Sequence, residues 1–488
     1  MKSNDFFKIS VKELVSFILL LLYFVVCMVY KNHMMINWLG VFCYIYCIYT
    51  WKCKTKESLF SPYFIFMTFF VLFNYGQPIM WAFNIHQANE IGSGILFYGH
   101  SYVPNESDLI NVQLYICICM LVFHFGVMLF TKRNNARTTD RKYNEFFITD
   151  NYKNKIKKSM RIVTGILLII TTPIAIYSAM SNMIVARLYG YNALYYGEHA
   201  TQAGYIQIIM YLFYPALVGY LIGCSNSNKS RIIVYSIFGI YAVLQLLSGD
   251  RGSWLYSLVI LVWLQTYYKK IPLKKYIKYI IVCIVGIYFL NIVTAVRDSG
   301  SGLSSLDFSN LLNNETSPIL DVFFELGGTM NIITFLFHVG SGIYPYTNTY
   351  LTSILGAVSS RGLNMFGIKQ ILVGDWFSQE FLKINWGAGF SMIGEAFLNG
   401  GYLGGLTYMA LIGVFLGIII NFANKSKYSN NPLELFITVA GLNAIIGFSR
   451  GALYLTLKEL LYGTILVVIC IKICYKILNR SAYDPTIL

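Results

Sequence analysis

Apolar runs of about 20 residues recur along almost the whole chain. A run of this length, folded as an α-helix, can cross a hydrocarbon core of roughly 30 Å. The composition agrees, because 56% of the 488 residues are hydrophobic and only 12% are charged, whereas soluble domains carry roughly 25% charged residues. The sequence therefore predicts an all-α, polytopic integral membrane protein without a sizeable soluble domain.

Hydropathy places about twelve transmembrane spans. We predict them at 14–30, 34–51, 62–83, 109–131, 162–181, 204–224, 232–249, 253–268, 277–295, 402–423, 433–449 and 460–478. The first run has a basic front but is not followed by a small-residue cleavage site, so we interpret it as a retained helix. Three regions follow from this placement: 1–295 with spans 1–9 and the basic loop 132–161, 296–401 as one long loop, and 402–488 with spans 10–12.

The net charge of +15 is explained by topology. With the N-terminus in the cytoplasm, most of the 37 Lys and Arg residues fall on the cytoplasmic side, in segments 1–13, 52–56, 132–161, 229–231, 269–278, 425–427 and 472–480. The positive-inside rule favours this orientation, and an even number of spans returns the C-terminus to the cytoplasm. The basic excess gives no reason to expect nucleic acid as a partner.

The loop 296–401 is the only long region on the predicted outer face. Loops beyond about 15 residues are usually functional or disordered, and this one is rich in apolar and aromatic residues. We expect it to fold, partly into helices that lie at the interface or dip between spans. A full crossing by the apolar run 319–339 would put the basic residues of the C-terminal third outside, so topology disfavours it.

Four arginines on the outer side are candidates for binding an anion. Arg251 lies in the tight hairpin SGDRGSW, Arg297 follows span 9, Arg450 follows span 11, and Arg361 lies in the long loop. Arginine presents a planar fork of donors that matches phosphate oxygens. Each one singly could also snorkel to a lipid headgroup or pair with a neighbouring aspartate. Convergence of several would create a pyrophosphate site.

The stretch GAGFSMIGEAFLNGG carries the second candidate. If 388–400 is helical, Ser391, Glu395 and Asn399 share one face and form a polar stripe, which we expect to face an external cleft. A carboxylate in such a cleft can accept a proton from a hydroxyl nucleophile. The alternative is a glutamate that caps a helix or neutralises an arginine.

The remaining candidates are weaker. His338 in FLFHVG could be a base, or a hydrogen-bonded packing residue. Asp375 and Trp376 in GDWF could line a sugar site, because aromatic rings stack on the apolar faces of pyranose rings. The ten cysteines lack the paired spacing and companion histidines of a zinc site, so no metal and no cofactor are expected.

These motifs together resemble a known family. Their order is a GDRG hairpin, Val296-Arg297-Asp298, a long outer loop, G-x-S-x-x-x-E-x-x-x-N-x-G, and a late SRG. The longest motif comprises Gly389, Ser391, Glu395, Asn399 and Gly401. It resembles that of the Wzy-type polymerases of O-antigen and related bacterial polysaccharides. The resemblance covers roughly 240–460 well and the N-terminal half only in hydropathy.

The resemblance implies an inner-membrane glycosyltransferase with both termini in the cytoplasm and a periplasmic active site. Such an enzyme moves a growing glycan from undecaprenyl pyrophosphate onto a lipid-linked repeat unit, without a nucleotide sugar or a metal. Its partners would be the undecaprenyl-pyrophosphate-linked oligosaccharide, membrane lipid and a chain-length regulator protein. The arginines would stabilise the leaving pyrophosphate, and Glu395 would accept the proton of the attacking hydroxyl.

Three other classes remain open. An O-antigen ligase-like transferase would use the same donor, and its catalytic histidine would favour His338 over Glu395. A flippase or transporter of lipid-linked oligosaccharide should show internal repeats and charged sites near mid-membrane, but no convincing repeat is found. A structural membrane protein would leave the long outer loop unexplained.

Overall fold

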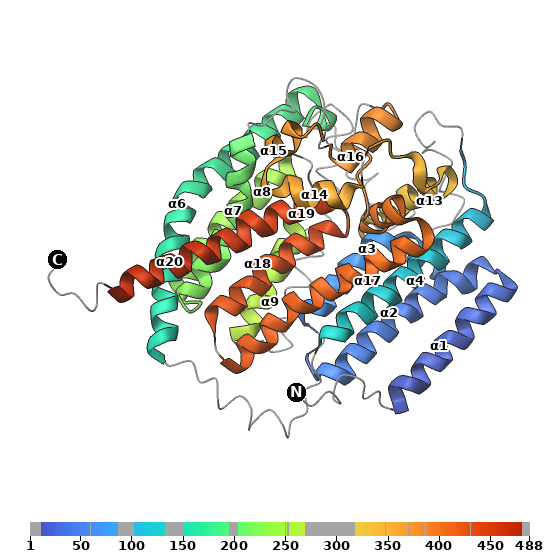
Figure 1. Ribbon diagram of the computed structural model, residues 1–488, viewed down its shortest axis with the longest axis horizontal. Helices are drawn as coiled ribbons and strands as arrows, with labels where there is room; N and C mark the ends of the chain where they lie inside the picture. Colours follow the sequence, from blue (N-terminus) through green and yellow to red (C-terminus); the bar gives the residue numbers. More distant parts are fainter. Residues whose placement is uncertain are drawn as a thin grey trace. The chain divides into compact units, whose positions relative to one another are not determined.

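The computed structural model describes residues 11–58, 60–85, 102–131, 150–194, 204–248, 250, 253–268, 318–346, 348–368, 371–384, 387–429 and 431–480. Over these ranges the regular structure is entirely helical (Figure 1). Nine of the described helices are long and apolar enough to cross a membrane. The expected all-α, polytopic class is thereby confirmed.

Contacts divide the chain into two units, each assembled from separate stretches. Unit 1 comprises Met1–Lys142, Leu320–Asn421 and Ile445–Thr456, and unit 2 comprises Tyr143–Ile319, Phe422–Ala444 and Leu457–Leu488. The helices are, in chain order, α1 (Val11–Tyr30), α2 (His33–Thr55), α3 (Pro62–Ala82), α4 (Glu106–Phe130), α6 (Asp150–Tyr189), α7 (Gly204–Gly223), α8 (Asn228–Leu247), α9 (Ser253–Tyr268), α12 (Pro318–Leu326), α13 (Thr329–Val339), α14 (Thr349–Val358), α15 (Ser360–Met365), α16 (Val373–Asp375), η6 (Trp376–Phe381), α17 (Met392–Ser429), α18 (Pro432–Phe448), α19 (Leu453–Lys458), η7 (Glu459–Leu466) and α20 (Val467–Arg480). Of these helices, α12, α17, α18 and α19 have residues in both units.

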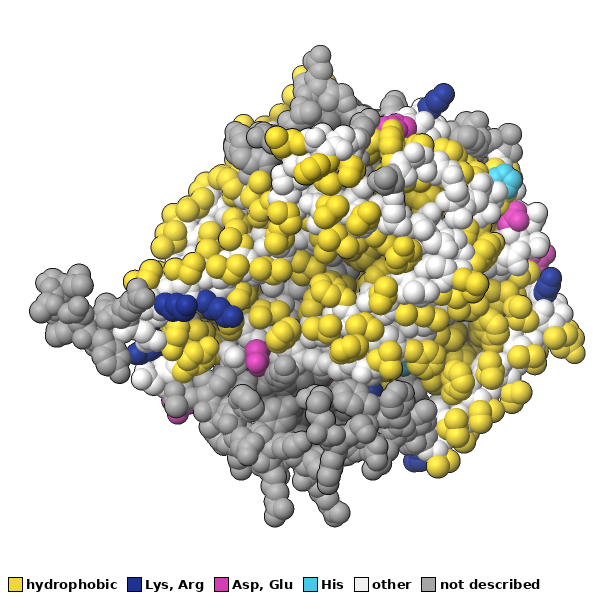
Figure 2. Space-filling view, viewed as in Figure 1, with side chains coloured by type: hydrophobic (Ala, Val, Ile, Leu, Met, Phe, Trp, Pro, Cys, Tyr) yellow, Lys and Arg dark blue, Asp and Glu magenta, His cyan; other side chains and the backbone are white. Residues whose placement is uncertain are grey.

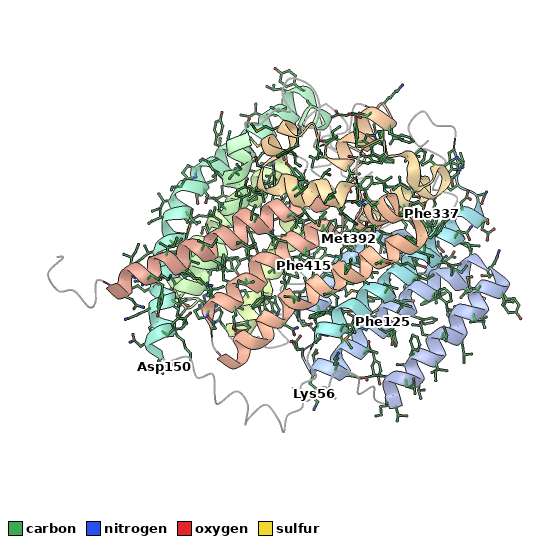
Figure 3. All side chains as sticks on the ribbon, in the orientation of Figure 1. Lys56, Phe125, Asp150, Phe337, Met392 and Phe415 are labelled. Carbon is green, nitrogen blue, oxygen red and sulfur yellow. The ribbon has the colours of Figure 1, made fainter. Side chains whose placement is uncertain are left out.

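The predicted spans fall on helices, except that 277–295 lies outside the described residues. Two of these helices, α9 with 16 residues and α18 with 17, are not among the nine that are long enough to cross a membrane, so the number of twelve spans stays a prediction. The helix whose length differs most from its predicted span, 162–181, is α6. It has 40 residues and begins at Asp150 (Figure 3). Part of the predicted basic loop is therefore helical. In this part Lys155 Nζ donates to Asn479 Oδ1 of α20 at 2.7 Å, and Ile156 is buried, so packing within unit 2 extends the helix beyond the apolar run.

Exposed apolar side chains cover much of the face seen in Figure 2, with only scattered charged groups. Ile169 on α6 is 77% exposed and Leu403 on α17 is 80% exposed. Large apolar side chains at such exposure are unfavourable in water and are expected for helices that contact lipid tails. The surface therefore agrees with a multi-pass membrane protein.

The long loop between spans 9 and 10 is folded where the structure describes it. The apolar run 319–339 is split at Gly327-Gly328 into α12, with 9 residues, and α13, with 11 residues. Each of the two helices is shorter than the ~20 residues that a crossing needs. The placement of this region on the outer face stays a prediction. A Cβ on Gly327 would lie 2.6 Å from the backbone nitrogen of Gln77, so this turn packs backbone to backbone on α3.

Helix α17 joins the end of this loop to span 10. It begins at Met392 (Figure 3) and is kinked at Gly401, whose φ of 59° and ψ of −150° are not helical. The pair Gly400-Gly401 therefore marks a kink within one long helix. Beyond it, Gly413 and Gly417 face α4 so closely that added Cβ atoms would lie 2.2 Å from Phe123 O and 2.8 Å from Val127 O. Small residues at this spacing allow membrane helices to pack at short distance.

Candidate functional site

Glu395 occupies the first turn of α17 and is only 1% exposed. Its Oε1 accepts a hydrogen bond from the Thr349 hydroxyl at 2.7 Å. Its Oε2 accepts one from the backbone N–H of Leu453 at 2.8 Å. Since Thr349 begins α14 and Leu453 begins α19, the carboxylate connects three helices of the chain within unit 1.

Asn399, one turn further along α17, completes the connection to α14. Its Oδ1 accepts from the backbone N–H of Thr349 at 2.7 Å. Its Nδ2 donates to the Thr349 hydroxyl at 2.6 Å and to the backbone oxygen of Glu395 at 2.7 Å. The first N–H groups of a helix have no partner inside that helix. Asn399 and Glu395 therefore fix the start of α14 through one threonine.

Ser391, just before α17, forms a second group of hydrogen bonds with Asn74 on α3. The Ser391 hydroxyl donates to Asn74 Oδ1 at 2.7 Å and accepts from the backbone N–H groups of Ile393 and Gly394. Asn74 Nδ2 donates in turn to the backbone oxygen of Ser449 at 3.2 Å. Ser391 and Asn74 are both 0% exposed. The segment 449–453 is thus held at one end by Asn74 and at the other by Glu395.

Glu395 and Asn399 share one hydrogen-bonded group around Thr349, whereas Ser391 belongs to a second group around Asn74, and the expected opening of this polar stripe to an external cleft is not seen in the described residues. The side chains of Ser391 and Glu395 are buried. Their polar atoms form hydrogen bonds with side chains and backbone groups of other segments. Asn399 alone is partly exposed. In the described structure the Glu395 carboxylate faces protein rather than an open site.

Arg450 lies inside the held segment and is exposed. Its guanidinium carbon is 5.7 Å from the centroid of the Phe73 ring, a distance at which a cation and an aromatic face attract each other. No ion pair of Arg450 is present among the described residues. The arginine therefore combines a fixed backbone with an accessible cationic group, as binding of an anion requires.

The other predicted arginines cannot be placed beside it. Arg251 and Arg297 lie outside the described residues, and of Arg361 only the backbone, in α15, is described. Their expected convergence with Arg450 stays a prediction.

His338 is exposed in the last turn of α13. Its ring stacks on Tyr102, with centroids 3.8 Å apart and an interplanar angle of 11°. The Tyr102 hydroxyl donates to Asp108 Oδ2 at 2.8 Å. The imidazole is therefore both accessible and oriented.

Asp375 is exposed, whereas Trp376 is only 2% exposed. The Trp376 ring packs edge to face against Tyr344 at 4.8 Å and against Phe381. Of this predicted sugar-binding pair, the aspartate is accessible and the tryptophan belongs to the packed interior of the loop helices.

Sequence reasoning missed a polar chain in unit 2. The Ser257 hydroxyl on α9 donates to Asn443 Oδ1 at 2.6 Å, and Asn443 Nδ2 on α18 donates to Glu459 Oε1 at 2.7 Å. The signal was present, because an acidic residue inside an apolar run is expensive and usually functional. Its position near the start of the last span, beside Lys458, made it resemble an interface residue.

Comparison with known proteins agrees with these motifs. The model of the family described as O-antigen polysaccharide polymerase Wzy matches residues 13–481, nearly the whole chain. No curated protein and no solved structure matches significantly.

Proposed function

The chain belongs to the Wzy family of O-antigen polysaccharide polymerases, and on that premise we propose that it elongates a lipid-linked glycan at the periplasmic face of the inner membrane. Membership makes it a membrane-embedded, glycosyltransferase-type enzyme of polysaccharide biosynthesis. The proposed donor is a growing glycan on undecaprenyl pyrophosphate, and the proposed acceptor is a lipid-linked repeat unit. The family match over residues 13–481 carries this proposal.

The proposed reaction has simple requirements. A hydroxyl oxygen of the acceptor sugar attacks the anomeric carbon of the donor glycan, and the bond from that carbon to the pyrophosphate oxygen breaks. The pyrophosphate leaves with the bonding electrons, and the hydroxyl proton passes to a base. Catalysis therefore needs cationic groups for the developing charge on the pyrophosphate and an acceptor for one proton.

Arg450 supports the first requirement, because its guanidinium is accessible and its backbone is fixed by Asn74 and Glu395. We assign Arg251, Arg297 and Arg361 to the same pyrophosphate site. A guanidinium offers paired donors to phosphate oxygens and keeps its charge at any physiological pH. Such groups can stabilise the leaving pyrophosphate without a metal ion.

For Glu395 the geometry favours a positioning role. Both carboxylate oxygens accept hydrogen bonds from protein groups, so the residue supports the Arg450 segment and the start of α14. The exposed His338 remains a candidate base on the loop side. Asp375 and the partly exposed Asn399 remain candidate contacts to glycan hydroxyls, with Ser391 and Trp376 supporting them from the interior.

Deletion of the gene followed by gel electrophoresis of the surface polysaccharide tests the proposal against its rivals. A polymerase mutant shows a single repeat unit in place of the long-chain ladder. Unattached long chains would indicate ligase-like transfer, and accumulation of the lipid-linked unit on the cytoplasmic side would indicate a flippase. Either of the last two results would overturn the proposal.

A further inference from the structure

Glu459 differs from Glu395 in how its oxygens are used. Asn443 donates to Glu459 Oε1 at 2.7 Å. No donor to Oε2 is present among the described residues, and Glu459 is partly exposed. One oxygen of this carboxylate is thus held in place, while the other can meet a ligand. Glu395 has no such oxygen, since Thr349 and Leu453 occupy both.

Asn443, which donates to Glu459, is itself fixed by a hydrogen bond. Asn443 is 5% exposed, and its Oδ1 accepts from the Ser257 hydroxyl at 2.6 Å, so both ends of the amide are used. Ser257 is also 5% exposed, and its backbone oxygen accepts from the Tyr214 hydroxyl at 3.3 Å. A chain of hydrogen bonds from α7 through α9 and α18 of unit 2 therefore ends on one carboxylate oxygen. An acid oriented this way loses little freedom when it reacts.

The helix that carries Glu459 is irregular at this point. Glu459 begins the π-helical stretch η7, between the α-helical turns of α19 and α20. Further along η7, a Cβ on Gly463 would lie 2.7 Å from the backbone oxygen of Tyr211 on α7, which indicates close packing. Wide π-turns inside α-helices are rare and occur frequently at functional sites. Here the π-helical stretch begins at a carboxylate within a helix long and apolar enough to cross a membrane, where a charge is costly unless it is used.

We propose that Glu459, oriented by Asn443 and Ser257, is the general base that accepts the proton of the acceptor hydroxyl. The inference rests on the proposed polymerase reaction. As the acceptor oxygen forms its bond to the anomeric carbon of the donor, its proton moves to Glu459 Oε2. The pyrophosphate leaves with the electrons of the broken carbon–oxygen bond. Glu459 is the catalytic residue in this scheme, and Asn443 and Ser257 are positioning residues.

The position of Glu459 fits this chemistry. In the predicted orientation α18 ends, and α19 begins, on the outer side, and Glu459 lies about two turns inside the start of the helix. A base at that depth can reach the first sugars of a lipid-linked acceptor near the headgroup region. The low dielectric there also strengthens its interaction with a hydroxyl proton.

The test uses purified full-length protein in proteoliposomes, with the undecaprenyl-pyrophosphate-linked repeat unit extracted from a strain that lacks the gene. Glu459→Gln keeps size and hydrogen bonding to Asn443 but cannot accept the proton. We expect its elongation rate to fall by roughly 10²- to 10⁴-fold, the usual contribution of a general base, while KM for the lipid-linked unit stays within about 2-fold. The elongation rate of Asn443→Ala should fall less, on the order of 10-fold, because the base itself remains.

The pH profile separates catalysis from a structural role. For the wild-type enzyme the rate should rise with pH as the base loses its proton, and this limb should be absent from the residual rate of Glu459→Gln. Glu434→Gln, the same change on α18 of the same unit, should leave rate and profile unchanged. Retention of more than about a third of the wild-type rate by Glu459→Gln, or an unchanged low-pH limb, would overturn the inference.

Two further outcomes are distinguishable. If Glu459→Gln does not accumulate, Glu459→Asp retains a carboxylate and should show a reduced rate with the low-pH limb present; a limb that is lost there too overturns the role as base. If the wild-type protein itself forms no ladder from the lipid-linked unit, the proposed polymerase function fails, whatever the variants do.

Discussion

Glu395 Oε2 accepts a hydrogen bond from the backbone N–H of Leu453 at 2.8 Å, across 58 positions of sequence. Leu453 is the first residue of α19, and the N–H groups of a first helical turn have no partner inside the helix. A carboxylate at that end also interacts favourably with the helix dipole. The other oxygen, Oε1, accepts from the side-chain hydroxyl of Thr349, the first residue of α14. One acidic side chain therefore supports the starts of two helices.

Replacement of Glu395 should first reduce stability. Glu395→Ala removes the acceptor for the buried Thr349 hydroxyl and for the partly buried N–H of Leu453, and a buried donor left without a partner costs about 1–3 kcal/mol. We expect a lower thermal midpoint and loss of polymer together. A thiol-reactive dye can report the unfolding of purified protein, because Cys27, Cys43, Cys47, Cys117 and Cys119 of the same unit are buried in the folded state.

Glu106→Gln is the matched control, since Glu106 is an exposed glutamate of unit 1 and should leave both the midpoint and the polymer unchanged. Glu395→Gln separates a structural role from a role as base. Its amide oxygen can still accept from the Thr349 hydroxyl, but its amide nitrogen is a donor and cannot accept from the backbone N–H of Leu453. A variant with wild-type stability and no polymer would support Glu395 as the base instead.

Asn74 should be needed for the placement of Arg450. Asn74→Ala removes the acceptor for Ser391 and the donor to the backbone of Ser449, both fully buried contacts, at a cost of about 1–3 kcal/mol. The dye-detected midpoint should fall, and the polymer ladder should shorten as the Arg450 segment loosens. Thr407→Ala is the control, because exposed Thr407 donates only within its own helix. An unchanged midpoint in Asn74→Ala would show that this network does not support the segment.

The sequence predicted the all-α, polytopic class because lipid solvation leaves a direct pattern in hydropathy, and nine described helices are long and apolar enough to cross a membrane. A local sequence signal, the pair Gly400-Gly401, lies at the kink of α17. The division of the apolar run 319–339 into two short helices at Gly327-Gly328 was not predicted. The start of α6 at Asp150 was not predicted either, because polar residues 150–161 become helical only through packing on α20.

The candidate site was harder to predict from sequence. Periodicity placed Ser391, Glu395 and Asn399 together, but it cannot tell an open cleft from a contact with α14 and the start of α19, whose residues lie some 50 positions away. Glu459 was missed for a related reason. Its partners Asn443 and Ser257 come from other helices, and no local pattern connects them.

Arg450 should be needed for elongation and dispensable for folding. Its side chain is exposed, and its contact with Phe73 contributes only about 0.5–1 kcal/mol. Arg450→Ala should accumulate normally in the membrane and lower the elongation rate by about 10²-fold or more, as loss of a donor to a developing charge does. Arg450→Lys keeps the charge but not the planar fork of donors. Its elongation rate should lie between the rates of the wild type and of Arg450→Ala. Lys383→Ala, at an exposed basic residue between η6 and α17, should have no effect.

Arg251→Ala and Arg297→Ala extend the same test to the predicted pyrophosphate site. If the three arginines converge, each variant alone should abolish the long-chain ladder while the protein still accumulates. Normal long-chain glycan from any two of these variants would contradict a shared site for the diphosphate.

The kink of α17 offers a test with a neighbouring control. Gly401 has a φ of 59° and a ψ of −150°, a region that is accessible almost only to glycine, so Gly401→Ala should cost about 1–3 kcal/mol. Three residues away, Gly404 is helical and a Cβ there would meet nothing within 4 Å, so Gly404→Ala should be neutral or stabilise by up to about 1 kcal/mol. Since the kink sets the direction of the turn that carries Glu395 and Asn399, only Gly401→Ala should also shorten the polymer. Equal thermal midpoints for the two variants would mean that α17 can straighten without loss of stability. The position of Glu395 would then not depend on the kink.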